Sequence, residues 1–76
     1  MSVHVKYFAS LRERLGREED LIELQGAVTV RDVWDRVADM PWPSNMLTAV
    51  NFDYVDPSAP VADGDEVAFF PPVTGG

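Results

Sequence analysis

The sequence feature that most constrains the fold is a short apolar strand ended by two prolines. Residues 66–70 alternate as a β-strand does, and the turn signal Asp63-Gly64 precedes them. Pro71 and Pro72 each lack a backbone N–H and hold φ near one value, so they fit neither a helix interior nor a central strand. We therefore expect the last strand of a domain here, followed by a stiff, extended exit.

The segment after this strand ends on Gly75 and Gly76. Extended, residues 71–76 reach roughly 20 Å at about 3.3 Å per residue, far enough to enter another protein. Glycine has no Cβ, so its backbone approaches a nucleotide or a nucleophile closely. A carboxylate on Gly76 is reactive, because ATP converts it to an acyl-adenylate that sulfur or nitrogen nucleophiles attack. We expect a domain over residues 1–70 and an extended, reactive tail over residues 71–76. The alternative is a frayed end.

Composition narrows the class of protein. The 76 residues suit one small domain. The absence of cysteine excludes a disulfide framework and agrees with a cytoplasmic protein. The net charge of −7 argues against a nucleic-acid partner, which needs a basic surface, and fits either a basic docking surface on a partner or simple solubility. No apolar run approaches the roughly 20 residues that span a bilayer, so we expect no membrane partner.

The chain begins with a period-two pattern. Val3, Val5 and Tyr7 alternate with more polar neighbours, which predicts a half-buried strand with these three side chains in the core. Phe8 then falls at the strand end, on the opposite face. His4, the single histidine, lies on that face too and is interpreted as a surface side chain.

A short helix and a second strand follow. Ser10 and Glu13 have the spacing of a capping box, and Gly16 fits a helix stop, so we expect a helix over residues 11–15. Residues 17–20 read as a charged loop. Residues 21–24 predict a second strand paired with the first.

The main helix is predicted over residues 30–40. Thr29 is its N-cap candidate, with Asp32 placed favourably for the helix dipole, and Pro41 is its stop. One apolar stripe with helical spacing is formed by Val30, Val33, Trp34 and Val37. Trp42, in the loop that follows, is expected to cover the edge of the core.

Later strands are predicted over residues 46–51, 54–55 and 66–70. In the last of these, Val67 and Phe69 face the core, which leaves Phe70 on the outer face with Phe8. Two aromatic side chains off the core face of two strands indicate a protein interface.

The order of elements indicates an α+β fold, with a sheet that carries one main helix on one face. The first and last strands are expected to be parallel neighbours. No catalytic constellation is visible: Asp63 and Asp65 fit turn chemistry rather than a metal site, and no glycine-rich phosphate loop appears. Any chemistry is therefore expected at the terminus and on a partner.

Residues 5–13 with Gly16, residues 49–51 and residues 63–76 resemble the small, sulfur-carrying subunit of molybdopterin synthase. The similarity covers essentially the whole chain. Its specific motif is the ending Pro-Pro-Val-Thr-Gly-Gly at residues 71–76, since Gly-Gly alone occurs in all ubiquitin-like carriers. Residues 41–45 form a shorter stretch than in many relatives.

The resemblance implies a ubiquitin-like β-grasp fold and a carrier cycle. An adenylating enzyme, similar to ubiquitin-activating enzymes, uses ATP on Gly76, and a sulfur donor then forms a thiocarboxylate. The tail enters the large synthase subunit, in a heterotetramer, and sulfur passes to cyclic pyranopterin monophosphate. The resemblance then implies an enzyme only in the sense of a small subunit, with no bound cofactor or metal. Gly75, which has no side chain, lets the backbone pass through a narrow channel so that Gly76 reaches the active site. The implied partner contacts are Phe8, Phe70, Pro71, Pro72, Val73 and Thr74.

Three alternatives remain open at this point. In the first, the chain is a sulfur carrier for another pathway, either thiamine thiazole formation or tRNA thiolation. In the second, it is a protein modifier that forms isopeptide bonds through Gly76. The third alternative is a plain binding module that uses Phe8 and Phe70 with an inert tail.

Overall fold

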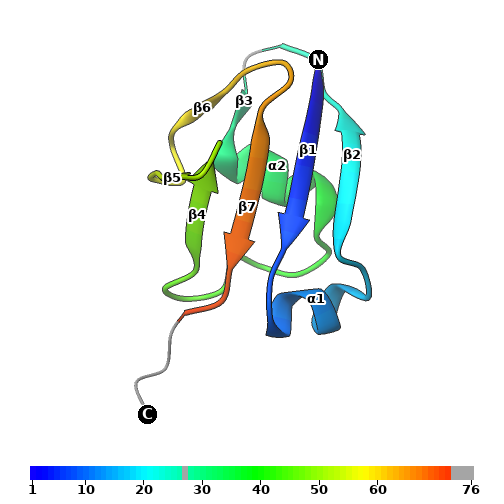
Figure 1. Ribbon diagram of the computed structural model, residues 1–76, viewed down its shortest axis with the longest axis vertical. Coiled ribbons are helices and arrows are strands. Elements are labelled where there is room, and N and C mark those ends of the chain that lie inside the picture. The colour runs from blue at the N-terminus through cyan, green and yellow to red at the C-terminus, as the bar shows by residue number, and fades with distance from the viewer. Residues whose placement is uncertain (27, 73–76) are drawn as a thin grey trace.

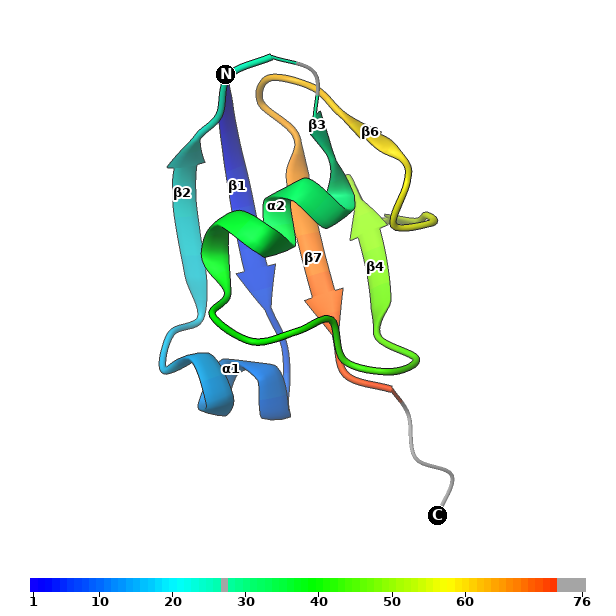
Figure 2. The same cartoon turned by 180° about the vertical axis from the view of Figure 1, so that it is seen from behind.

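The computed structural model describes residues 1–26 and 28–72, and its main feature is a mixed five-stranded sheet with one helix across one face (Figures 1 and 2). In the order β2-β1-β7-β4-β5, the strands are Glu19–Glu23, Ser2–Tyr7, Glu66–Phe70, Leu47–Val50 and Asp53–Tyr54. The helices are α1 (Ser10–Leu15) and α2 (Val30–Val37). In this part of the chain, neither helix has the length and apolar character needed to cross a membrane. The predicted α+β architecture is confirmed.

The first and last strands lie side by side and parallel at the centre of the sheet, as predicted. Val5 pairs with Val67, and Tyr7 pairs with Phe69. Strand β2 is antiparallel to β1, and β4 is antiparallel to β7. Because β7 ends at Phe70, the chain leaves the sheet at the same end as α1 (Figure 1).

Helix α2 begins where the sequence predicts. The Thr29 hydroxyl accepts a hydrogen bond from the Asp32 backbone N–H at 3.2 Å, and an Asp32 carboxylate oxygen accepts one from the Thr29 N–H at 2.8 Å. This reciprocal pair satisfies donors that an uncapped helix leaves open. The capped first turn holds the apolar stripe of α2 against the sheet.

Helix α2 ends at Val37, three residues before the end that we predicted at Met40. The backbone beyond it is held in another path, because the Trp34 indole N–H donates to the Met40 carbonyl at 3.2 Å. Arg17 donates to the Val37 carbonyl, which satisfies one acceptor at the helix end. Pro41 also disfavours a helical conformation at the residue before it. A side chain of the helix itself and one distant in sequence thus hold the backbone where the helix ends.

The capping box predicted for α1 is wrong. Ala9, not Ser10, is the N-cap residue, and no side chain caps the helix. The reason lies in the backbone, since Ala9 takes φ 52° and ψ −128° and turns the chain sharply from β1 into α1. The predicted stop is confirmed, because Gly16 has φ 74° and its N–H donates to the Arg12 carbonyl at 3.0 Å.

Two short strands form a second sheet that we did not predict. Strand β3 (Val28–Thr29) pairs antiparallel with β6 (Pro60–Val61), and Val28 lies opposite Val61. Strands of this length show no period in the sequence, and Pro60 argues against a strand. Strand β2 also begins at Glu19, inside the segment predicted as a charged loop.

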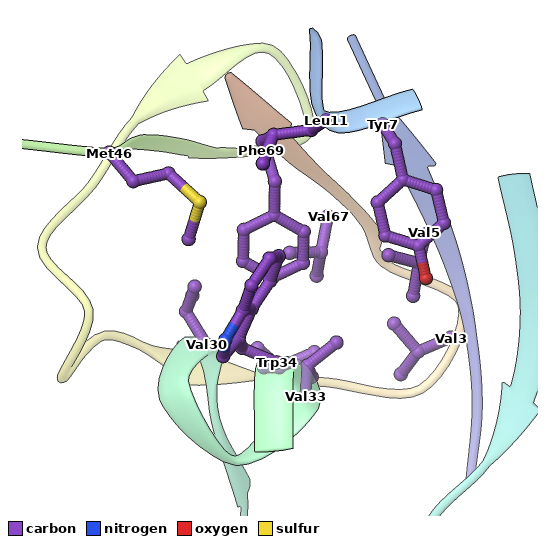
Figure 3. Packing of buried hydrophobic residues seen from close by; sticks show 11 residues of the cluster. Val3, Val5, Tyr7, Leu11, Val30, Val33, Trp34, Met46, Val67 and Phe69 are labelled. Atoms are coloured by element: carbon purple, nitrogen blue, oxygen red, sulfur yellow. The ribbon is translucent and has the colours of Figure 1, made fainter. Parts of the chain in front are cut away.

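The core lies between α2 and the inner face of the large sheet, the face that α2 covers. Trp34 projects from α2 toward Phe69 (Figure 3), with ring centroids 5.1 Å apart and an angle of 68° between the ring planes. Trp42 packs edge-on against Phe69 at 6.1 Å, so it covers the core edge as predicted. The buried core consists of Val3, Val5, Tyr7, Leu11, Val30, Val33, Trp34, Met46, Val61, Val67 and Phe69.

A polar network closes this core beside α1. The Tyr7 hydroxyl donates to Asp20 at 2.7 Å, and the Arg17 Nε donates to the same carboxylate oxygen at 2.5 Å. Burial raises the pKa of the Tyr7 phenol, and the Asp20 carboxylate raises it further. Burial also tends to raise the pKa of Asp20, but hydrogen bonds from Arg17 and Tyr7 outweigh it, so this pKa lies below its usual range.

Candidate functional site

The outer face of the sheet, opposite α2, carries a pair of stacked aromatic rings. Phe70 ends β7, and Phe8 follows β1 with its N–H bonded to the Phe69 carbonyl at 3.2 Å. The two rings lie 4.6 Å apart with an angle of 11° between their planes. Phe8 is 38% exposed. Both rings therefore lie off the core face, as predicted, and their role as partner contacts stays a prediction.

Strands β4 and β5 add apolar side chains that the sequence analysis did not single out. Leu47 lies directly opposite Phe70 on the neighbouring strand, and the Tyr54 ring is 6.0 Å from the Phe70 ring. Phe52, in the turn between β4 and β5, is 88% exposed. Strand pairing places Leu47 and Tyr54 on this face, since directly opposed residues share a face. The aromatic face is defined here as Phe8, Leu47, Phe52, Tyr54 and Phe70.

The tail begins next to this face. A hollow of about 430 Å³ is lined by Pro71 and Pro72 together with Phe8, Leu47, Tyr54 and Phe70. The same two prolines also line a hollow of about 400 Å³ that is bounded by Arg14 and Ser44, on the other side. A protein that binds the start of the tail, at Pro71 and Pro72, would therefore also contact an apolar surface. The predictions for Val73, Thr74, Gly75 and Gly76 lie outside the described residues.

A strained residue positions Phe8. Ala9 has a positive φ of 52°, a region that residues other than glycine rarely occupy. This turn leaves Phe8 on the outer face while Leu11, three residues later, is buried in the core. The Leu11 N–H donates to the Phe8 carbonyl at 3.2 Å, which fixes the turn. Backbone strain of this kind is often retained at functional sites.

Several charged side chains near the face are engaged with one another or with the backbone. Lys6 Nζ lies 3.2 Å from a Glu66 oxygen, and His4 Nε2 lies 3.3 Å from a Glu19 oxygen. Asp65 accepts a hydrogen bond from the Ala62 N–H at 2.8 Å, in keeping with a turn role. Within residues 1–26 and 28–72, no group of three or more His, Asp or Glu side chains is placed to hold a metal ion.

Comparison with known proteins gives full-length matches. The ThiS family model matches residues 5–76. The molybdopterin synthase sulfur carrier subunit of Chlamydomonas reinhardtii is 39% identical, with all of both chains covered. The corresponding subunit of Escherichia coli (strain K12) is 35% identical, with 97% of this chain and 99% of the relative covered.

Solved structures agree on the fold. SAMP1 from Haloferax volcanii has a TM-score of 0.82 and 30% identity, with 100% of both chains covered. In a complex of subunits 1 and 2 of molybdopterin-converting factor from Helicobacter pylori 26695, one chain has a TM-score of 0.68 and 23% identity, with 100% of both chains covered, which bears on the fold alone.

The expected ubiquitin-like β-grasp fold is confirmed by these structures, and the resemblance to sulfur carrier subunits is confirmed by the relatives. The matched segment reaches from β1 through the Gly-Gly ending, so it contains the aromatic face as well as the tail. This chain belongs to the ThiS family.

Proposed function

We propose that this chain is the sulfur carrier subunit of a molybdopterin synthase. The observation that carries the proposal is its likeness to curated sulfur carrier subunits over the full length of both proteins. The position of the tail root supports it, since Pro71 and Pro72 adjoin an exposed apolar surface. Such a surface gives a partner a place to hold the domain while the tail reaches inward.

The chemistry is assigned to the carboxylate of Gly76. An oxygen of this carboxylate attacks the α-phosphate of ATP on an adenylating partner, which releases pyrophosphate and leaves an acyl-adenylate. Hydrosulfide supplied by a sulfur donor attacks the acyl carbon, AMP departs, and a thiocarboxylate remains. In the synthase this sulfur passes to cyclic pyranopterin monophosphate, and water restores the carboxylate. Two such rounds supply both sulfur atoms of the product dithiolene.

The large synthase subunit supplies the catalytic side chains in this proposal. On the outer face of this chain, Lys6 and Glu66 form an ion pair with each other, at 3.2 Å. Its contribution is to dock through the aromatic face and to deliver Gly76, while Gly75 keeps the approach narrow because it has no side chain. The adenylating enzyme and the sulfur donor are separate partners, and ATP belongs to the former.

A second candidate function is protein modification. It is favoured by the likeness to SAMP1, since solved relatives carry the name small archaeal modifier protein 1. The same acyl-adenylate would then be captured by a lysine amine, which forms an isopeptide bond in place of a thiocarboxylate. Denaturing gels of cell extract separate the two functions, because only a modifier leaves covalent adducts on other proteins.

The test is the intact mass of the chain after incubation with ATP, the adenylating enzyme and a sulfur donor. We expect one terminal oxygen to be replaced by sulfur, and fragmentation should map the change to Gly76. A chain without Gly76 is the matched control, because it should keep the fold and fail to load. The proposal would be contradicted if the control acquired sulfur. It would also be contradicted if the full chain acquired none from partners that load another carrier.

A further inference from the structure

A second hollow lies on the aromatic face, farther from the tail than the first. Its floor is made by Ala49 and Ala68, which lie directly opposite each other on β4 and β7. Phe52 and Phe70 border it, and the hollow measures about 160 Å³. Pockets for small molecules usually measure about 300–1,000 Å³, so this one suits a single side chain rather than a ligand.

Phe52 is held at this hollow in a strained conformation. Asn51 and Phe52 form the two-residue turn between β4 and β5, with φ values of 50° and 73°. Turns with two positive φ values favour Asn followed by Gly, and a bulky residue in the second position is unusual. The Phe52 side chain is 88% exposed, so burial does not compensate for this strain. A largely exposed aromatic residue in a strained turn position points to a role outside the free domain.

The strained turn is anchored rather than loose. The Asn51 N–H donates to the Glu66 carbonyl at 2.8 Å, and the Asn51 side chain accepts from the Glu66 N–H at 3.0 Å. The same side-chain amide donates to an Asp65 carboxylate oxygen at 2.9 Å. These bonds fix the turn to the start of β7. Phe52 is therefore presented at a defined place, which lowers the entropy lost on binding.

Negative charge lies beside the hollow, whose own rim is neutral. Lys6 and Glu66 both line it, and the Lys6 Nζ lies 3.2 Å from the Glu66 oxygen. That ion pair neutralises Lys6, while Asp65 and Asp53 add negative charge beside the turn. The whole chain has a net charge of −7. A complementary partner therefore places a basic residue next to the apolar side chain that enters the hollow.

We propose that Phe52 and this hollow form a second anchor for the large synthase subunit, which inserts an apolar side chain flanked by a basic residue. This inference rests on the proposed function. The hollow shares Phe8, Tyr54 and Phe70 with the hollow at the tail root, so one partner surface can cover both. A stable subunit needs a larger interface than an activating enzyme that binds transiently, which favours the large subunit as occupant.

The test is the dissociation constant between the chain and the large synthase subunit of the same organism, measured by calorimetry. Phe52→Gly removes the ring and suits the positive φ, so we expect binding at least tenfold weaker with a melting temperature unchanged or raised. Ala49→Val fills the floor of the hollow and should also weaken binding. Leu21→Ala is the matched control, because Leu21 is 74% exposed on β2, at the opposite edge of the sheet, and should bind as wild type.

Several outcomes would overturn the inference. Unchanged binding by Phe52→Gly, or an equal loss in Leu21→Ala, removes the specific anchor. A loss confined to adenylation assigns the anchor to the activating enzyme instead. A shift from dimer to monomer in sedimentation assigns it to a second copy of the chain. Failure of the wild-type chain to bind the large subunit overturns the proposed function as well, whereas wild-type binding without an effect of either hollow variant overturns only the inference.

Discussion

The two faces of the central strands both carry aromatic residues, but these residues have different roles on each face. On the inner face, Tyr7 and Phe69 are 2% and 0% exposed beneath α2. One residue further along each strand, Phe8 and Phe70 lie on the outer face, stacked on each other at 4.6 Å. Because side chains alternate along a strand, neighbours in sequence belong to different surfaces. The inner rings hold the fold, and the outer rings are free to meet a partner.

The contrast is sharpest between Phe69 and Phe70. Phe69→Ala should lower the free energy of unfolding by about 3–5 kcal/mol, because it opens a cavity in the core. Phe70→Ala should leave stability near wild type and weaken binding to the large subunit about tenfold or more. Urea denaturation and calorimetry measure the two effects. Equal losses of stability in both variants would show that Phe70 belongs to the core and that the comparison fails.

The hydroxyl groups of Tyr7 and Tyr54 give a second contrast between the faces. Tyr7→Phe should lower the free energy of unfolding by about 1.5–3 kcal/mol, since it removes a hydrogen bond to the charged Asp20. Tyr54 is 72% exposed, so Tyr54→Phe should change stability little. Thermal unfolding of both variants checks the difference. A larger effect at Tyr54 would contradict the division of the faces.

The N-termini of the two helices give a third contrast, with a smaller expected change in stability. Thr29→Ala should destabilise the domain by about 1 kcal/mol, because it removes the cap of α2. Ser10→Ala should change stability by only a few tenths of a kcal/mol, as α1 has no side-chain cap. Chemical denaturation of the pair measures both. A comparable loss in Ser10→Ala would restore the capping box that the structure rejects.

The smallest expected effect concerns acid. The folded state holds the pKa of Asp20 below its usual range, so this carboxylate stabilises the domain at neutral pH. That stabilisation is lost as the pH falls below about 4 and through the folded pKa. Asp20→Asn should therefore lower stability at pH 7 and flatten its decline toward low pH. If the stability of Asp20→Asn falls toward low pH as steeply as that of wild type, other groups determine the acid sensitivity of the domain.

The sequence predicted the parts of the fold that have strong periodicity. Strand β7 keeps its expected bounds because Asp63-Gly64 and Pro71 punctuate it on both sides. The stripe of α2 follows from helical spacing, and its cap follows from Thr29 and Asp32. These signals are local, so neighbouring residues carry all the information that they need.

The remaining features depend on contacts that are distant in sequence. The early end of α2 is held in part by Arg17, which lies before β2, beside the local bond from the Trp34 indole of the helix itself. Only part of the candidate site was predicted. Alternation along the strands put Phe8 and Phe70 on the outer face, but Leu47 and Tyr54 join them only through strand pairing. Phe52 is exposed because it lies in the two-residue turn between β4 and β5, whose bounds are set by strand pairing.

A single-turnover transfer of sulfur from the thiocarboxylated chain tests whether the chain carries sulfur for a molybdopterin synthase. The loaded chain is mixed with the large subunit and cyclic pyranopterin monophosphate, and the mass of Gly76 is followed together with molybdopterin. We expect the thiocarboxylate to return to a carboxylate as molybdopterin appears. A thiocarboxylate that persists without product, when the same large subunit is active with an established carrier, would contradict the claim.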